Sequence, residues 1–146
     1  MLAFNKFNAF VLAVATKKID LNADTLKIML TDTASVVTNS VKTDITEISA
    51  GNGYSAGGAA VGSNSASQTS GTMKVVGDAV TFTASGGAIA QFRYLVLYDD
   101  TAASKDLIGW WDNGSEVNLG DGSSFTLGDD FSGDNWDATT PLFTLA

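Results

Sequence analysis

Carboxylates and tryptophans are the side chains of this sequence that could do chemistry. The chain has no histidine and no cysteine, which excludes imidazole acid–base catalysis, thiolate nucleophiles and Cys/His zinc sites. Two adjacent carboxylates, Asp99 and Asp100, follow the most β-prone run of the chain, and Trp110 and Trp111 come shortly after. Paired carboxylates beside a tryptophan that stacks on a sugar ring would suit a glycosidase. Acidic residues at a strand end are usually turn formers, however, and we expect no enzyme.

A second group of carboxylates lies near the C-terminus and could bind calcium, which prefers hard oxygen ligands. Its members are Asp121, Asp129, Asp130, Asp134 and Asp137, with Asn113, Asn118 and Asn135 nearby. Their spacing lacks the alternating carboxylates and the terminal glutamate of an EF-hand loop. We therefore favour a solvated acidic loop, keep calcium binding as the alternative, and expect no cofactor.

Residues 51–58, Gly-Asn-Gly-Tyr-Ser-Ala-Gly-Gly, superficially resemble a phosphate-binding loop. The Gly-Lys-Ser/Thr ending of such loops is missing and no helical pattern follows, so we interpret the segment as a turn that uses positive φ angles. The net charge of −8 repels phosphate backbones, so we also expect no nucleic-acid partner.

Strands must position most of these residues. The alternation of residues 25–31 predicts a strand, and the near-continuous apolar run 92–98 predicts the central strand, buried on both faces. The segments 73–76 and 80–82 are predicted to pair as a hairpin across Gly77-Asp78. Further short strands are predicted over residues 107–111, 117–119, 125–127 and 142–145.

The apolar residues of the N-terminal segment repeat with a different period. Phe4, Phe7, Val11 and Val14 lie three and four residues apart, with Phe10 beside them, which predicts an amphipathic helix. This helix either covers the core of its own domain or docks on a neighbouring subunit. Both interpretations stay open from the sequence.

A chain of 146 residues suits one domain. We predict a mainly β fold, an antiparallel β-sandwich of jelly-roll type or a barrel, preceded by an N-terminal α-helical arm. The arm is expected to span residues 1–22 and the β-sandwich domain residues 23–146. No stretch approaches the roughly 20 apolar residues that cross a bilayer, so no membrane partner is expected.

Several segments together resemble a family of small virion structural proteins of tailed bacteriophages. They are Phe4-Asn5-Lys6-Phe7, Asp24-Thr25-Leu26-Lys27, Asp44-Ile45-Thr46-Glu47-Ile48 leading to Gly51-Asn52-Gly53-Tyr54, Thr83-Ala84-Ser85-Gly86-Gly87, the run from Phe92 to Tyr98, and Leu107-Ile108-Gly109-Trp110-Trp111-Asp112. The resemblance covers nearly the whole chain and includes no catalytic motif. The region from Gly128 to Thr140 is longer and more acidic than the family pattern.

The resemblance implies a component of the phage particle. We expect a capsid decoration or cement protein that binds the outer surface of the major capsid protein lattice and stabilises the head. It would be made in the cytoplasm of the bacterial host, reside on the capsid outer surface of the virion, and self-associate, with a homotrimer as the first expectation. The alternatives are a tail-tube, connector or tail-tip subunit, and a receptor- or glycan-binding module.

Five aromatic residues are the predicted contacts with partner subunits, because aromatic side chains dominate the energetics of interfaces. They are Phe4, Phe7, Phe10, Trp110 and Trp111. Two adjacent tryptophans in a strand point to opposite faces, so one is expected in the core and the other at an interface or its rim. Core packing is the alternative for each of the five.

Overall fold

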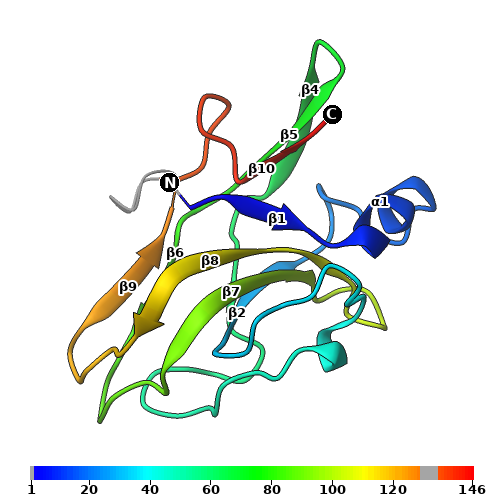
Figure 1. Cartoon of the computed structure of the whole chain (residues 1–146). Coiled ribbons are helices and arrows are strands. Elements are labelled where there is room, and N and C mark those ends of the chain that lie inside the picture. Colours follow the sequence, from blue (N-terminus) through cyan, green and yellow to red (C-terminus); the bar gives the residue numbers. More distant parts are fainter. Residues whose placement is uncertain (1, 129–134) are drawn as a thin grey trace.

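The strands of the residues that the structure describes form three antiparallel sheets (Figure 1). The computed structural model describes residues 2–128 and 135–146, and the mainly β prediction is confirmed there. The strands are β1 (Phe4–Lys6), β2 (Leu26–Thr31), β3 (Ala59–Ala60), β4 (Ser65–Thr69), β5 (Thr72–Val76), β6 (Val80–Thr83), β7 (Phe92–Asp99), β8 (Leu107–Val117), β9 (Ser124–Leu127) and β10 (Phe143–Leu145); the helices are α1 (Asn8–Ala15) and the short 3-10 helix η1 (Lys42–Asp44).

The largest sheet has the order β1-β8-β7-β2-β3, so β7 is its central strand, as predicted. Leu97 pairs with Ile28 on β2, and Leu95 pairs with Trp111 on β8. Both faces of β7 are buried: Leu95 and Leu97 belong to one apolar cluster and Val96 to another. A strand covered on both faces must be apolar at consecutive positions, which explains its near-continuous apolar sequence.

Two apolar clusters cover the two faces of this sheet. The larger contains residues of β2, β7 and β8 together with residues of the β6–β9 pair and of the β10-β5-β4 sheet, which gives the fold its sandwich-like layers. The smaller lies on the opposite face. It consists of Phe7, Met29, Val96, Tyr98, Leu107 and Trp110, with Ile45 and Tyr94 packed against it.

The predicted hairpin between β5 and β6 is wrong. Both strands exist, but β5 pairs with β4 and β10, and β6 pairs with β9. Gly77 exchanges both backbone hydrogen bonds with Trp136, and the Asp78 amide donates to the carbonyl of Gly62. These bonds connect the short segment to distant parts of the chain, so it is a crossing between sheets and not a turn.

The hairpin that does form, β4–β5, projects from the body of the molecule (Figure 1). Its turn contains Ser70 and Gly71, with φ angles of 51° and 82°, the left-handed conformations that a two-residue hairpin turn requires.

The predicted N-terminal helix exists as α1, but a strand precedes it, so the extension of the helix back to Phe4 is wrong. Phe4 lies in β1 and pairs with Trp111, and the helix begins only at Asn8. The strand can approach β8 closely because Gly109 has no side chain; a Cβ there would lie 2.1 Å from the Phe4 ring. Within the helix the buried residues are Phe10 and Ala13.

The expected boundary at residue 22 does not separate an arm from a domain. β1 is a strand of the main sheet, and the Phe10 ring packs edge-on against Phe143 of β10 at 5.6 Å between ring centroids. Phe4 stacks on the same Phe143 ring at 4.7 Å. The segment 2–22 thus belongs to the sandwich of its own chain. Among the described residues, no helix is long and apolar enough to cross a membrane.

Candidate interaction surface

The five predicted contact residues lie mostly inside the fold. Phe7 and Phe10 are fully buried, Trp111 is 2% exposed and Trp110 8%. Only Phe4 is partly exposed. Core packing, the alternative interpretation, is therefore what the structure shows for four of the five, and they are not available to a partner in this conformation.

The two tryptophans do point to opposite faces of β8, as predicted. Trp110 belongs to the smaller cluster and packs on Phe7, with 4.6 Å between ring centroids. Trp111 belongs to the larger cluster, between Phe4 at 5.2 Å and Trp136 at 6.4 Å. Because both faces of the sheet are covered by the chain itself, neither side chain reaches an interface rim.

A different set of apolar side chains is exposed. Within residues 2–128 and 135–146 the exposed large apolar residues are Val11 at 44%, Leu12 at 68%, Val36 at 55% and Val37 at 47%. The first two lie on α1, and the others lie in the loop that follows β2. We call these four residues the helix–loop patch. Single exposed apolar residues are normal on protein surfaces, whereas a cluster of them marks an interaction surface.

The two halves of the patch are joined by a backbone hydrogen bond. The amide of Asn8 donates to the carbonyl of Val37 at 2.9 Å. Val11 and Leu12 follow Asn8 by three and four residues, so they lie on the same face of the helix as the residue that contacts the loop. This bond therefore places the two exposed segments of the patch beside each other.

The loop that carries Val36 and Val37 is held in place by further hydrogen bonds. The Val36 amide donates to Oδ1 of Asn39 at 2.8 Å, and the Asn39 amide donates to the carbonyl of Val36 at 2.8 Å. The loop is attached to the start of β8, where the Leu107 amide donates to the carbonyl of Ser40 at 3.0 Å. These bonds present the two valines on an ordered turn.

The other end of the helix is held by an ion pair. Nζ of Lys18 lies 2.6 Å from Oδ1 of Asp106, whose side chain is 8% exposed while that of the lysine is 49% exposed. Beside this end lies an open groove of about 490 Å³. It is lined by Val14, Lys17, Ile19, Asp20, Leu21, Asn22, Ala66 and Met73.

The glycine-rich segment 51–58 is held by a half-buried carboxylate, that of Glu47. Glu47 accepts hydrogen bonds from Nζ of Lys42 at 2.7 Å, from the hydroxyl of Tyr54 at 2.8 Å and from the amide of Gly57. Burial alone would raise the pKa of Glu47, but these three donors outweigh it and lower the pKa below the ordinary value. Burial raises the pKa of Tyr54, whose hydroxyl therefore stays protonated and donates.

This segment packs too closely against β2 to hold a phosphate group. The amide of Leu30 donates to the Tyr54 hydroxyl at 3.0 Å. Gly58 has a φ of +76°, and a Cβ there would lie 1.9 Å from the carbonyl oxygen of Ile28. The interpretation of this segment as a turn with positive φ angles is confirmed, since the close backbone approach and the positive φ both require glycine.

Asp99 and Asp100 do not form a glycosidase site with the tryptophans. Asp100 is held between Nζ of Lys27 at 2.9 Å and Nζ of Lys105 at 2.8 Å, and these two lysines lower its pKa. Asp99 is completely buried. A sugar ring could not stack on Trp110 or Trp111, because the chain itself already covers their faces.

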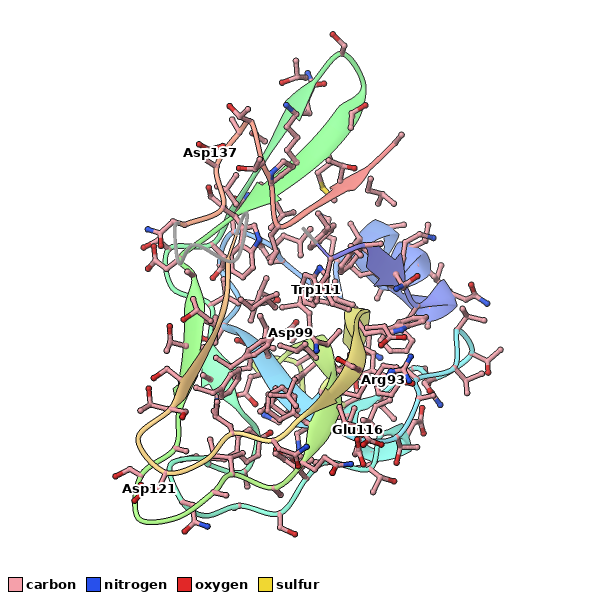
Figure 2. The ribbon with its side chains drawn as sticks, turned by 60° about the vertical axis from the view of Figure 1, so that its left-hand side comes forward. Arg93, Asp99, Trp111, Glu116, Asp121 and Asp137 are labelled. Atoms are coloured by element: carbon pink, nitrogen blue, oxygen red, sulfur yellow. The ribbon has the colours of Figure 1, made fainter. Side chains whose placement is uncertain are left out.

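The acidic C-terminal residues are dispersed where the structure describes them. Figure 2 shows Asp121 and Asp137 at opposite ends of the molecule. Asp121 accepts from the amide of Gly86 at 2.9 Å, and Asp137 accepts from the amides of Thr139 and Thr140, which lower its pKa. Asp129, Asp130 and Asp134 lie outside the described residues. Within residues 2–128 and 135–146, no group of three or more potential ligands could hold a metal.

Sequence reasoning missed the helix–loop patch. A signal for it was present, because Val36 and Val37 are adjacent branched apolar residues in an otherwise polar segment.

Comparisons of this chain with protein-family models, with curated proteins and with solved structures found no match.

Proposed function

We propose that this protein is a structural virion component of a tailed bacteriophage, a capsid decoration or cement protein that attaches to the outer surface of the major capsid protein lattice. The sequence resemblance to small phage virion proteins supports the class. The observation that carries the attachment is the helix–loop patch, which gathers the exposed large apolar side chains of the described residues on two hydrogen-bonded segments.

The patch is mounted on rigid elements. Phe10 and Ala13 bury the inner side of α1, and the loop is bonded to β8. A surface that is already ordered loses little conformational entropy on binding. Covering four half-exposed side chains would contribute about 1 kcal/mol each. Such a weak single contact gains strength when a homotrimer presents several copies to a repeating lattice.

The first test is the copy number of this protein in purified particles, measured by quantitative mass spectrometry against the major shell protein. A nearly equimolar ratio supports a component that coats the capsid lattice. A much lower ratio would place the protein in the tail or connector, the alternative within the same particle. Absence from the particle would overturn the proposal.

The second test changes the patch itself. Leu12→Asp places a charge at the most exposed of the four positions, so we expect at least about a tenfold weaker binding to heads that lack the protein. Ser67→Asp is the matched control, because Ser67 is exposed on β4 and the same charge is added outside the patch. Equal binding by both variants would exclude the patch as the attachment surface.

The oligomeric state is tested separately, by light scattering of the purified protein. A trimer would agree with the proposed assembly. A glycan-binding function receives no support from the aromatic residues that suggested it, because Trp110 and Trp111 are buried.

A further inference from the structure

Asp99, the last residue of β7, carries a buried oxygen without a hydrogen-bond donor. The residue is 0% exposed. Its Oδ1 accepts from the amides of Thr101 at 2.8 Å and Ala102 at 3.2 Å, which shapes the turn after the strand. Its Oδ2 is buried and has no partner that donates to it. A buried, unsatisfied carboxylate oxygen is costly, so its surroundings need an explanation.

A second carboxyl group, that of Asp24, interacts with Asp99 and raises its pKa. Asp24 belongs to the turn before β2, where its Oδ2 accepts from the amide of Asp20 at 2.6 Å. An ionised carboxylate only accepts hydrogen bonds. Two carboxyl groups in contact therefore form a hydrogen bond only when one of them is protonated.

The lysines in and beside the two turns form ion pairs with other carboxylates. Lys18 binds Asp106, while Lys27 and Lys105 bind Asp100. The remaining acidic group is Asp20, whose Oδ1 accepts from the amides of Asn22 and Ala23. No lysine ion pair recorded among the described residues reaches Asp24 or Asp99, so the contact between them carries uncompensated negative charge when both are ionised.

Burial, followed by the contact with Asp24, raises the pKa of Asp99 from 3.8 to about 6, against the opposing effect of the amides of Ala102 and Thr101. A metal ion would need more ligands than two carboxylates, and no group of three potential ligands occurs in the described part of the chain. A shared proton needs only one oxygen from each carboxyl group.

We propose that Asp24 and Asp99 share one proton in mild acid and thereby form a latch that fastens the turn at residues 20–25 to the turn at residues 99–106. The same turns are joined by two fixed bonds, from the amide of Asp100 to the carbonyl of Thr25 and from the amide of Thr25 to Oγ1 of Thr101, both 2.8 Å long. The latch adds a pH-dependent bond to these. Once Asp99 loses this proton at higher pH, neither carboxyl group donates to the other, and the contact loosens.

A change in the Asp24–Asp99 contact can affect the helix–loop patch through Lys105 and Asp106. The carbonyl of Lys105 accepts from the amide of Lys42 at 2.9 Å, and Asp106 holds Lys18 after the end of α1. Both segments that build the patch are thus attached to the turn that the latch controls. The inference concerns the dynamics of the turns and does not depend on what the patch binds.

The test is amide hydrogen exchange of the two turns at pH 5 and pH 7.5, corrected for the intrinsic effect of pH on exchange. With a pKa of about 6 in the closed state and 3.8 in the open state, the latch should increase protection about tenfold at the lower pH. Asp99→Asn should show the same protection at both pH values, because the amide always donates to Asp24. Asp100→Asn, the control, should keep the pH dependence.

Equal protection of the wild-type turns at both pH values would overturn the inference, as would a pH dependence that survives in Asp99→Asn. If that variant fails to fold, the carboxyl carbon resonance of Asp99 in the wild-type protein decides. A pKa of Asp99 near the ordinary value of an aspartate would contradict the latch. Recovery of the acid level of protection at pH 7.5 on addition of calcium would replace the proton with a metal and refute the proposal.

Discussion

Replacing Phe7 with alanine tests whether this residue belongs to the core or contacts a partner subunit. The side chain is 0% exposed and packs on Trp110 with 4.6 Å between ring centroids. Removing a buried phenylalanine costs about 3–5 kcal/mol, which includes the lost transfer energy and the cavity. Domains of this size unfold with about 5–15 kcal/mol, so Phe7→Ala should lose about a fifth or more of the stability and lower the melting temperature by at least about 10 °C.

Urea denaturation followed by the fluorescence of the three buried tryptophans measures this loss. Val11→Ala is the control, because Val11 lies one helical turn further along and is 44% exposed. We expect it to change stability by less than about 0.5 kcal/mol. The reasoning fails if Phe7→Ala is as stable as Val11→Ala yet no longer assembles, since Phe7 would then contact a partner instead of the core.

Three further changes test other parts of the fold. Gly58→Ala should destabilise by more than about 3 kcal/mol in denaturant titration, since its Cβ would collide with the Ile28 carbonyl, whereas Gly120→Ala should be tolerated, as nothing lies within 4 Å of that position. Deleting residues 2–18 should abolish cooperative unfolding measured by calorimetry; a sharp transition in the truncated chain would restore the idea of an arm. The lowered pKa of Glu47 means that its stabilising hydrogen bonds are complete above pH 4.5 and are lost as the pH falls through the folded-state value; melting temperatures should therefore drop less steeply below pH 4.5 in Glu47→Gln than in the wild type.

The strands of the main sheet could be predicted because their burial determines their composition. β7 is covered on both faces and is almost continuously apolar, so its position at the centre followed from its sequence. The pairing partner of a strand could not be predicted from its sequence in the same way. Gly77 and Asp78 have the residue types of a tight turn, but their hydrogen bonds go to Trp136 and Gly62, and no local pattern encodes such distant pairing.

The candidate site was harder to predict because cores and interfaces select the same side chains. Phe7, Phe10, Trp110 and Trp111 have the composition of a contact surface, yet the chain buries all four. The actual exposed patch consists of ordinary aliphatic residues. The expected apolar stripe of Phe4, Phe7, Val11 and Val14 did not find this patch, because the helix begins only at Asn8 and buries Phe10 and Ala13, which leaves Val11 and Leu12 exposed.

The packing of Phe143 against Phe4 and Phe10 affects how the protein folds during synthesis. The two N-terminal rings lie 4.7 Å and 5.6 Å from the ring that emerges from the ribosome more than a hundred residues later. Until β10 is available, one end of the larger core stays open and its apolar side chains are exposed to other nascent chains. Folding dominated by such distant contacts is slow, in the range of milliseconds to seconds. The final step of folding is therefore expected after residue 143 has left the exit tunnel, and premature termination before β10 should produce an aggregating product.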